Sequence, residues 1–283
     1  MPKVSIILPS YNGEKYIAES IQSIINQSID DWELIIVNDC SSDKTLKIAN
    51  SFAEKDNRII VISNESNKKL PASLNIGFEQ AHGKYLTWTS DDNIYKYNAL
   101  EKMCEYLDSH PNTDMVSMNM DIIDEKGNFL HEFSNYFVYK RNAEYLMDSC
   151  NIGAAFMYRQ TIAQKVGSYD TNTFCAEDYD YWCRIALTGK IDYTNDNIYM
   201  YRLQSESLTA TKQDVVFEKT LKIKQKYATQ FFNKFPYTEK DKALMWFKAS
   251  KENRPAKYNK YYRSIKLKRL LVKLAIPYSH NVF

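Results

Sequence analysis

The sequence predicts an α/β fold built on a parallel β-sheet that helices cover on both faces. In the first 124 residues, short apolar runs alternate with stretches whose apolar residues recur at helical spacing. Parallel strands need a crossover connection, usually a helix, so this alternation indicates a helix-covered parallel sheet. The chain holds only seven Gly and seven Pro, and 14% of its residues are aromatic. This composition excludes a disordered protein, and 283 residues suffice for one large domain with an appendage.

The expected strands of this first part are short apolar runs. They lie at residues 4–9, 33–39, 58–63, 87–92 and 114–124. Helices are expected between them, where apolar residues lie three and four positions apart, as Leu100, Met103 and Leu107 do. Beyond about residue 127 this order breaks down. There we expect strands at 128–133, 153–159 and 198–203, and helices at 141–148, at 177–187 and from 214 onward.

The net charge of +2 is unevenly distributed. From Lys248 to the end, ten Lys and Arg residues stand against one Glu, a net charge of +9, whereas the rest of the chain carries −7. We expect a boundary near residue 210, followed by a helical, basic extension at 211–283. Such a tail favours an anionic partner.

The cysteines predict neither a disulfide framework nor a zinc site. Their number is odd and no Cys-x-x-Cys spacing occurs among Cys40, Cys104, Cys150, Cys175 and Cys183. We therefore expect a protein of the reducing cytoplasm. No run of 18 apolar residues occurs, so no membrane-spanning helix is expected. The apolar stretch at the N-terminus is too short for a secretory signal and predicts the first strand instead.

The acidic pair Asp91-Asp92 is the most informative feature of the chain. It follows an apolar run that begins at Tyr85, so both carboxylates are expected at the carboxyl end of a buried strand. Open α/β sheets bind ligands at this end of their strands. Two adjacent carboxylates repel each other unless positive charge or hydrogen-bond donors lie between them, and a divalent cation that carries phosphates meets this need. The alternative is a solvated turn that binds nothing.

Polar loops follow the first, second and fourth expected strands, at residues 9–12, 38–43 and 90–93. Because the carboxyl ends of parallel strands lie on one edge of a sheet, we expect these loops side by side. Each loop alone has an ordinary explanation, since Asn38-Asp39 can simply lead into a helix N-cap. Neither the Gly-rich dinucleotide loop nor the Gly-x-x-x-x-Gly-Lys phosphate loop is present, which disfavours the two commonest nucleotide-binding motifs.

Five motifs occur in order along the chain: Val4-Ser-Ile-Ile-Leu-Pro-Ser-Tyr-Asn12, Val37-Asn-Asp-Cys-Ser-Ser-Asp43, Leu74-Asn-Ile-Gly77, Gly83-Lys-Tyr-Leu-Thr-Trp-Thr-Ser-Asp-Asp92 and Ala176-Glu-Asp-Tyr-Asp-Tyr-Trp-Cys-Arg184. Over residues 1–210 they resemble the motifs of glycosyltransferase family 2. The resemblance implies an α/β, GT-A-type, Rossmann-like three-layer sandwich with a C-terminal helical extension. Residues 1–124 would be its nucleotide-binding half and residues 125–210 its acceptor-binding half.

The resemblance also implies a set of residues that bind the donor nucleotide: Pro9, Tyr11, Asn12, Asp39, Lys69 and Asp91. Tyr11 matches the residue that stacks on the base, and Pro9 adds a backbone contact. Asp39 matches the carboxylate that accepts the imide N–H of the base, which favours uracil or thymine. Asp91 would contact the ribose.

Further matches concern the metal and the chemistry. Asp92 matches the second Asp of the Asp-x-Asp motif, which holds Mn²⁺ or Mg²⁺, and one carboxylate suffices because the donor diphosphate is the main ligand. Asp178 matches the general base of the Glu-Asp motif, and a helix start favours its ionised form. Taken alone, Asp178 is better explained as a helix-start carboxylate without a chemical role, and the other four motifs reverse that preference. Gly153, Glu177 and Trp182 are assigned to the donor-sugar or acceptor region, although Gly153 can equally serve packing.

The chain departs from the family pattern at four positions. Ser90 replaces the first Asp of Asp-x-Asp, Asn38 replaces the first Asp of an Asp-Asp pair, Leu74 stands where Arg is frequent, and Gln204 stands where many members have a His that contacts the metal or the diphosphate. A Gln is a poor metal ligand and cannot become a cation. Stabilisation of the leaving group would therefore fall to the metal, to Lys68 or Lys69, or to Arg202.

Residues 257–276 contain an amphipathic basic helix. Four leucines recur at helical spacing, Leu267, Leu270, Leu271 and Leu274, and four basic residues cover the other side, Lys266, Lys268, Arg269 and Lys273. This pattern is typical of a helix on an anionic membrane surface. Docking of the leucines onto the catalytic domain or a partner subunit is an equal alternative. No nucleic-acid-reading module accompanies the charge, so nucleic acid is not an expected partner.

The resemblance to glycosyltransferase family 2 implies an inverting, metal-dependent glycosyltransferase of the hexosyltransferase type that moves a sugar from a UDP- or dTDP-sugar to a hydroxyl. The expected acceptor is a glycan or lipid-linked saccharide in the synthesis of a bacterial capsule, O-antigen or exopolysaccharide. The expected location is the cytoplasm, with peripheral attachment to the inner face of the plasma membrane. One alternative is a catalytically degenerate homologue that binds a nucleotide sugar or serves as a membrane scaffold. Another is a nucleotidyltransferase, which would need a Gly-rich loop after the first strand.

Overall fold

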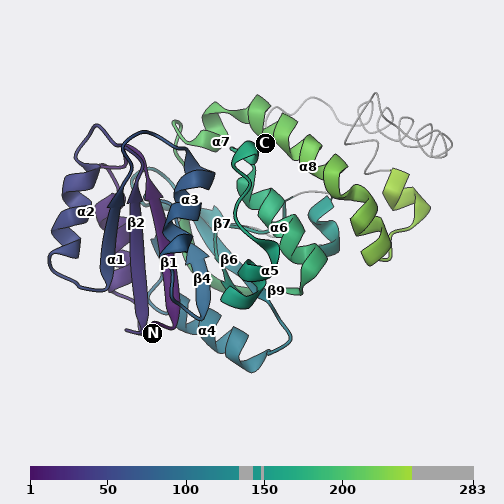
Figure 1. The fold of residues 1–283 in the computed structure, drawn as a ribbon, viewed down its shortest axis with the longest axis horizontal. Coiled ribbons are helices and arrows are strands. Elements are labelled where there is room, and N and C mark those ends of the chain that lie inside the picture. Colours follow the sequence, from purple (N-terminus) through teal and green to yellow (C-terminus); the bar gives the residue numbers. More distant parts are fainter. Residues whose placement is uncertain (134–142, 148–149, 244–283) are drawn as a thin grey trace. The chain divides into compact units, whose positions relative to one another are not determined.

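The computed structural model describes residues 1–133, 143–147 and 150–243. The chain divides into two compact units, Met1–Thr220 and Leu221–Phe283, and Figure 1 shows that the sheet belongs to the first. The basic segment 257–276 and the first residues of the helix expected at 141–148 lie outside the described residues. No helix within the described ranges is both long and apolar enough to cross a bilayer. All five cysteines are free thiols.

Within the described residues the sheet has nine strands in the order β3-β2-β1-β4-β8-β6-β9-β5, with β7 paired to β6. The strands are β1 (Val4–Ser10), β2 (Trp32–Asn38), β3 (Ile59–Ser63), β4 (Tyr85–Trp88), β5 (Ile94–Tyr95), β6 (Met115–Ile123), β7 (Phe129–Glu132), β8 (Phe156–Arg159) and β9 (Ile191–Arg202). β1 runs parallel to β2 and β4, and β2 runs parallel to β3, so the predicted parallel sheet is confirmed for these strands. β8 lies antiparallel between β4 and β6, so β6 joins the sheet through a strand from later in the chain.

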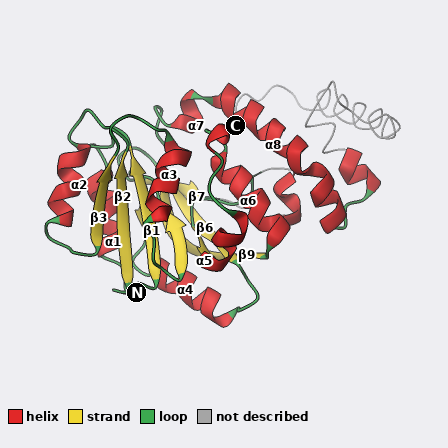
Figure 2. Ribbon diagram, in the orientation of Figure 1, coloured by secondary structure: helices red, strands yellow, loops and turns green. Residues whose placement is uncertain are grey.

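Helices cover both faces of the sheet, as Figure 2 shows. The helices of the described residues are α1 (Ile17–Ile25), α2 (Thr45–Ala53), α3 (Leu70–Glu79), α4 (Ala99–Ser109), α5 (Gln160–Val166), α6 (Glu177–Thr188), α7 (Leu208–Thr211) and α8 (Gln213–Lys234), and α8 runs from the first compact unit into the second. Alternate side chains of β1 point to opposite faces. Leu8 belongs to the same core cluster as Ile21 of α1 and Leu100 of α4, whereas Ile7 packs against Gly77 of α3. The predicted three-layer α/β arrangement is therefore confirmed.

Gly77 lets α3 lie unusually close to the sheet. A Cβ at this position would be 2.4 Å from Cγ2 of Ile7 and 3.2 Å from Cγ2 of Val37. Only a residue without a side chain tolerates this approach. α3 begins directly after the loop that follows β3, so the tight packing of the helix also fixes the end of that loop.

The loops after β1, β2 and β4 meet at one edge of the sheet, as predicted, and the loop after β3 joins them there. Ser10 at the end of β1 is in register with Asn38 at the end of β2. The amide of Asp39 donates to the carbonyl of Ser10 at 2.8 Å, and the amide of Asn64 donates to the carbonyl of Asn38 at 2.9 Å. On the other side of β1, the amide of Thr89 donates to the carbonyl of Ile7 at 2.9 Å. Backbone pairing alone thus brings these loops together.

Several elements differ from the sequence-based expectation. β9 begins at Ile191, seven residues before the predicted strand. Its backbone pairs with β6, but its first half carries mostly polar, partly exposed side chains without an apolar pattern. β4 ends at Trp88, and the two-residue β5 follows it. The short helix expected near 141–148 is a 3₁₀ helix, η2 (Ala143–Met147), in its described part. By contrast, the edge strand expected at 128–133 is confirmed as β7.

Candidate functional site

Asp91 lies against the turn that follows β1. Its Oδ2 accepts a hydrogen bond from Oγ of Ser10. A Cβ at Gly13 would lie 2.0 Å from the same oxygen, so this turn can close over the carboxylate only with glycine there. Burial, together with the charge of Asp92, raises the pKa of Asp91 to about 7. Ser10 and Gly13 were not singled out from the sequence, although Ser10 stands inside the first motif.

Hydrogen bonds fix the backbone carbonyl and one carboxylate oxygen of Asp92, whereas its other carboxylate oxygen has no hydrogen-bond donor among the described residues. Its Oδ2 accepts a hydrogen bond from Nε2 of Gln204, and its backbone carbonyl accepts one from Nε of Arg202 at 2.9 Å. Its Oδ1 is buried and makes no hydrogen bond to any described residue. Burial raises the pKa of this carboxyl group. A buried carboxylate oxygen without a donor is the kind of ligand that Mg²⁺ or Mn²⁺ prefers, so Asp92 fits the predicted metal role.

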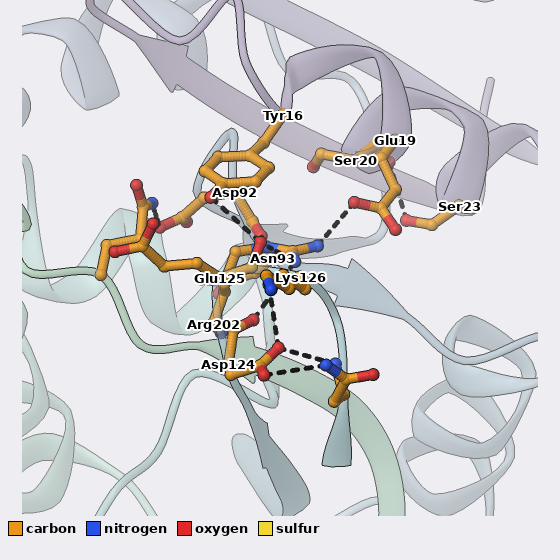
Figure 3. A network of polar contacts seen from close by, with 12 residues as sticks. Tyr16, Glu19, Ser20, Ser23, Asp92, Asn93, Asp124, Glu125, Lys126 and Arg202 are labelled. Atoms are coloured by element: carbon orange, nitrogen blue, oxygen red, sulfur yellow. Dashed lines mark hydrogen bonds and ion pairs between the residues drawn. The ribbon is translucent and has the colours of Figure 1, made fainter. Parts of the chain in front are cut away.

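Arg202, at the end of β9, is the centre of the polar network in Figure 3. Its side chain is only 2% exposed, and its guanidinium pairs with Oε2 of Glu19 on α1 at 2.5 Å. It also donates to the carbonyl of Glu125 at 3.1 Å and lies 4.5 Å from the ring centroid of Tyr16. All three guanidinium nitrogens are therefore engaged within the protein. The sequence-based suggestion that Arg202 stabilises the leaving group is thus replaced by a structural role around Asp92.

Asp39 is buried and organises the loop that follows β3. Its Oδ1 accepts hydrogen bonds from Nδ2 of Asn64 and from the amide of Lys68, both at 2.8 Å. Its Oδ2 accepts one from the amide of Lys69 at 2.9 Å. A carboxylate oxygen can accept more than one hydrogen bond, so Oδ2 retains capacity for a ligand donor. Tyr11 lies on the adjacent loop with 54% of its surface exposed, as a ring that stacks on a base must be.

The remaining predicted nucleotide-binding residues have other local contacts. Oδ1 of Asn12 accepts from the amide of Ser42 at 2.9 Å, and the amide of Asn12 donates to Oγ of Ser41 at 3.0 Å. Asn12 therefore ties the loop after β1 to the loop after β2. Pro9 is buried in β1. The side chain of Lys69 is exposed at the start of α3. The nucleotide contacts of these residues stay a prediction.

The first turn of α6 carries two acidic side chains without a cationic partner among the described contacts. Glu177 is only 4% exposed, and its Oε2 makes no hydrogen bond to a described residue. Asp178 accepts a hydrogen bond on Oδ1 from the amide of Tyr179 at 2.6 Å. Burial raises the pKa of Asp178, and burial with the charge of Asp178 raises that of Glu177 to about 8. The third acidic residue of this turn, Asp180, forms an ion pair with Arg184 at 2.9 Å.

Aromatic packing places α6 beside the carboxyl end of β4. The ring of Trp182 is 1% exposed and packs edge-on against Phe156 of β8, with centroids 4.6 Å apart. Phe156 in turn packs against Trp88, the last residue of β4, at 5.7 Å. The predicted sugar or acceptor contact of Trp182 is therefore corrected: its ring belongs to the core beneath the site. At Gly153 a Cβ would lie 3.0 Å from Cε of Met120, which favours the packing alternative.

Comparison with known sequences identifies the family. The family profile described as Glycosyl transferase family 2 matches residues 5–167. The chain belongs to glycosyltransferase family 2. An uncharacterised glycosyltransferase of Methanocaldococcus jannaschii is 33% identical to this glycosyltransferase over 240 residues, which cover 82% of each chain.

Solved structures share the fold of this glycosyltransferase. S. aureus TarS in complex with UDP-GlcNAc has a TM-score of 0.69 at 20% identity, covering 95% of this chain and 77% of that chain. The mannosyltransferase PcManGT from Pyrobaculum calidifontis, in complex with GDP-Man and Mn²⁺, has a TM-score of 0.67 at 15% identity, covering 98% of this chain and 76% of that chain. The predicted GT-A-type α/β fold is confirmed.

The pKa of Glu177 predicts how stability depends on pH. The folded protein keeps the proton of Glu177 up to about pH 8, while the ordinary value is 4.5. The stability contributed by the protonated group is therefore complete below that ordinary value and is lost as the pH rises toward 8. From about pH 5 to about pH 8, this group should lower the free energy of unfolding by about 1 kcal/mol per pH unit. Glu177→Gln should remove that slope.

Urea unfolding of the full chain across this pH range measures the effect. Glu79→Gln is the matched control, because Glu79 is an exposed carboxylate at the end of α3. The control should keep the slope of the parent protein. An identical pH slope for Glu177→Gln and the parent would show that Glu177 is not protonated in the folded state.

Proposed function

We propose that this glycosyltransferase transfers a sugar from a UDP- or dTDP-sugar to a hydroxyl acceptor, with inversion at the anomeric carbon. The observation that carries the proposal concerns Oδ1 of Asp92, beyond the carboxyl end of β4. This oxygen is buried and has no hydrogen-bond donor among the described residues. The loops with Tyr11 and Asp39 lie at the same edge of the sheet. The ligands of the structural relatives, UDP-GlcNAc in TarS and GDP-Man with Mn²⁺ in PcManGT, support a nucleotide-sugar donor.

In this proposal the base of the donor lies between Tyr11 and Asp39. The exposed ring of Tyr11 offers a face for stacking. The free capacity of Asp39 Oδ2 suits the imide N–H of uracil or thymine, while Asn64 and the amides of Lys68 and Lys69 hold the carboxylate still. A preorganised acceptor loses little entropy when the base binds, so Asp39 contributes both affinity and choice of base.

Asp92 would hold Mn²⁺ or Mg²⁺ through Oδ1. Within the described ranges, no group of three or more His, Cys, Asp or Glu side chains is arranged to hold a metal alone, so phosphates and water would supply the other ligands. When bound, the cation would neutralise charge on the departing nucleoside diphosphate. Lys68 and Lys69 are exposed and make no ion pair within the described part of the chain, so they are available to assist, whereas Arg202 is not.

Asp178 would act as the general base. The acceptor hydroxyl oxygen attacks C1 of the sugar as Asp178 takes the hydroxyl proton. The bond between C1 and the diphosphate oxygen breaks, and its electron pair leaves with the nucleoside diphosphate. Burial raises the pKa of Asp178, which increases the affinity of this base for the hydroxyl proton.

We further propose a growing, lipid-linked bacterial surface polysaccharide as the acceptor. The support is the sequence pattern of residues 257–276, whose leucines and basic side chains suit an anionic membrane surface. In this proposal the enzyme acts in the cytoplasm and attaches peripherally to the inner face of the plasma membrane.

A panel of UDP-, dTDP- and GDP-sugars tests the proposed donor. Water can replace the acceptor, so incubation of the full chain with Mn²⁺ and each nucleotide sugar should release free sugar and nucleoside diphosphate slowly. UDP-GlcNAc is the first probe, because TarS binds it. We expect hydrolysis of a UDP- or dTDP-sugar. A preference for a GDP-sugar would overturn the assignment of Asp39, and binding without hydrolysis of any sugar would indicate the degenerate homologue.

Asp178→Asn should lower the rate of donor hydrolysis at least about 100-fold, because the amide cannot accept the proton. The affinity for UDP with Mn²⁺ should stay nearly unchanged, since Asp178 is not assigned to nucleotide binding. Steady-state kinetics and isothermal titration measure the two quantities. A parallel loss of UDP affinity would make Asp178 a structural residue instead.

Asp92→Ala should remove the metal dependence of UDP binding, because the open carboxylate oxygen is lost. Titration of UDP with and without Mn²⁺ measures this dependence in the parent and the variant. Asp31→Ala is the control, since Asp31 is exposed and immediately precedes β2. The metal assignment fails if the parent protein binds UDP equally well in the presence and absence of Mn²⁺.

A further inference from the structure

Asn75 joins α3 to the segment that leads into α6. Its Nδ2 donates to the carbonyl of Tyr169 at 2.9 Å, and its Oδ1 accepts from the amide of the same residue at 2.8 Å. One side-chain amide thus satisfies both backbone groups of Tyr169, as a neighbouring strand would. The sequence motif Leu74-Asn-Ile-Gly77 contains Asn75, and neither the nucleotide site nor the metal site described above uses it.

The side chain of Tyr169 continues this connection to α6. Its ring stacks on that of Tyr181, with centroids 4.0 Å apart and planes at 7°. Tyr181 lies three residues after Asp178 on α6, so both side chains lie on neighbouring positions of one helix surface. Burial is the main cause of the raised pKa of Tyr169, and the charges of Tyr181 and Asp178 add to it.

Tyr169 also contacts the donor half of the protein. Its hydroxyl accepts a hydrogen bond from Nε1 of Trp88 at 3.1 Å, at the end of the strand that leads to Asp91 and Asp92. Its ring packs in parallel with that of Phe78 on α3, with centroids 5.8 Å apart. Tyr169 therefore lies where α3, the end of β4 and α6 meet.

The start of α3 is hydrogen-bonded to Asp39, the carboxylate proposed to bind the base. The amide of Lys69, the residue just before α3, donates to Oδ2 of Asp39 at 2.9 Å. Further along, Gly77 seats the helix on Ile7 of β1. One helix thus holds the base-binding loop at its start and, through Asn75, the approach to the catalytic helix in its middle.

We propose that Asn75 is a positioning residue, which holds Asp178 in place relative to the donor by fixing Tyr169. The inference rests on the proposed role of Asp178 as general base. The hydrogen bonds of Asn75 go to the backbone of Tyr169 and not to Tyr11, Asp39 or Asp92. Loss of Asn75 therefore acts on the chemical step and leaves donor binding intact. A displacement of about 1 Å at a catalytic group can cost about 100-fold in rate.

A double-mutant cycle with Asp178→Asn tests this role. The substrate is the nucleotide sugar of the panel that the parent hydrolyses fastest. Asn75→Ala should lower kcat about 10- to 100-fold, with KM and the UDP affinity in the presence of Mn²⁺ changed less than about twofold. On the Asp178→Asn background, Asn75→Ala should change the residual rate less than about threefold, because a base that is absent cannot be misplaced.

Two further variants complete the experiment. Gln80→Ala, which removes an exposed amide just after α3, should leave all parameters at parental values. Asn75→Asp keeps the acceptor for the amide of Tyr169 but loses the donor to its carbonyl, so its effect should be intermediate. If the Asn75→Ala variant does not fold, Asn75→Asp takes its place in the double-mutant cycle.

Each contrary outcome has a distinct meaning. An equal fold-loss of rate on both backgrounds, or a parallel loss of UDP affinity, would show that Asn75 only supports the fold, and it would overturn the inference while leaving Asp178 as the base. A parental rate for Asp178→Asn alone would overturn the base assignment and the inference with it.

Discussion

The site depends on two neighbouring carboxylates that are held half-buried at the end of a strand. Burial of a charged group without a partner is unfavourable, so such a pair persists only where the surrounding contacts fix it. Asp91 is satisfied by Ser10 and enclosed by the turn at Gly13. Asp92 is fixed through its carbonyl and one carboxylate oxygen, while the other oxygen stays open. The fold therefore maintains a local electrostatic cost that a bound cation would offset.

The replacement of a family His by Gln204 changes how this arrangement responds to pH. An ordinary His side chain loses its charge at about pH 6.5, whereas the amide of a Gln is neutral at every pH at which proteins fold. The amide of Gln204 donates to Oδ2 of Asp92, so its contribution is to orient the carboxylate rather than to add charge. Arg202, two residues earlier, is positively charged, but its guanidinium forms an ion pair with Glu19 and donates hydrogen bonds to backbone carbonyls. Gln204 and Arg202 therefore hold Asp92 without a change of charge near neutrality, and the group beside it that titrates there is Asp91, whose pKa is raised to about 7.

The sequence predicts the edge of the sheet that carries the site, because parallel strands place their carboxyl ends together and polar loops follow those ends. It also predicts the start of α6, where acidic residues precede an apolar face. The position of β8 between β4 and β6 could not be predicted, since an antiparallel partner from later in the chain leaves no local pattern. The role of Arg202 was missed for a similar reason. Residue type indicates what a side chain can do, but only tertiary packing decides whether it faces a ligand or the core.

The aromatic contacts around Tyr169 link the geometry of the proposed base to its reactivity. Stacked rings position α6 with little conformational freedom. In its first turn Glu177 is buried and Asp178 is partly buried, and this burial raises the pKa of both groups. A change that loosens α6 would therefore displace Asp178 and hydrate it at the same time, lowering its proton affinity as its distance from the acceptor grows. Position and basicity are set by the same packing, so contacts far from the donor can control the chemical step.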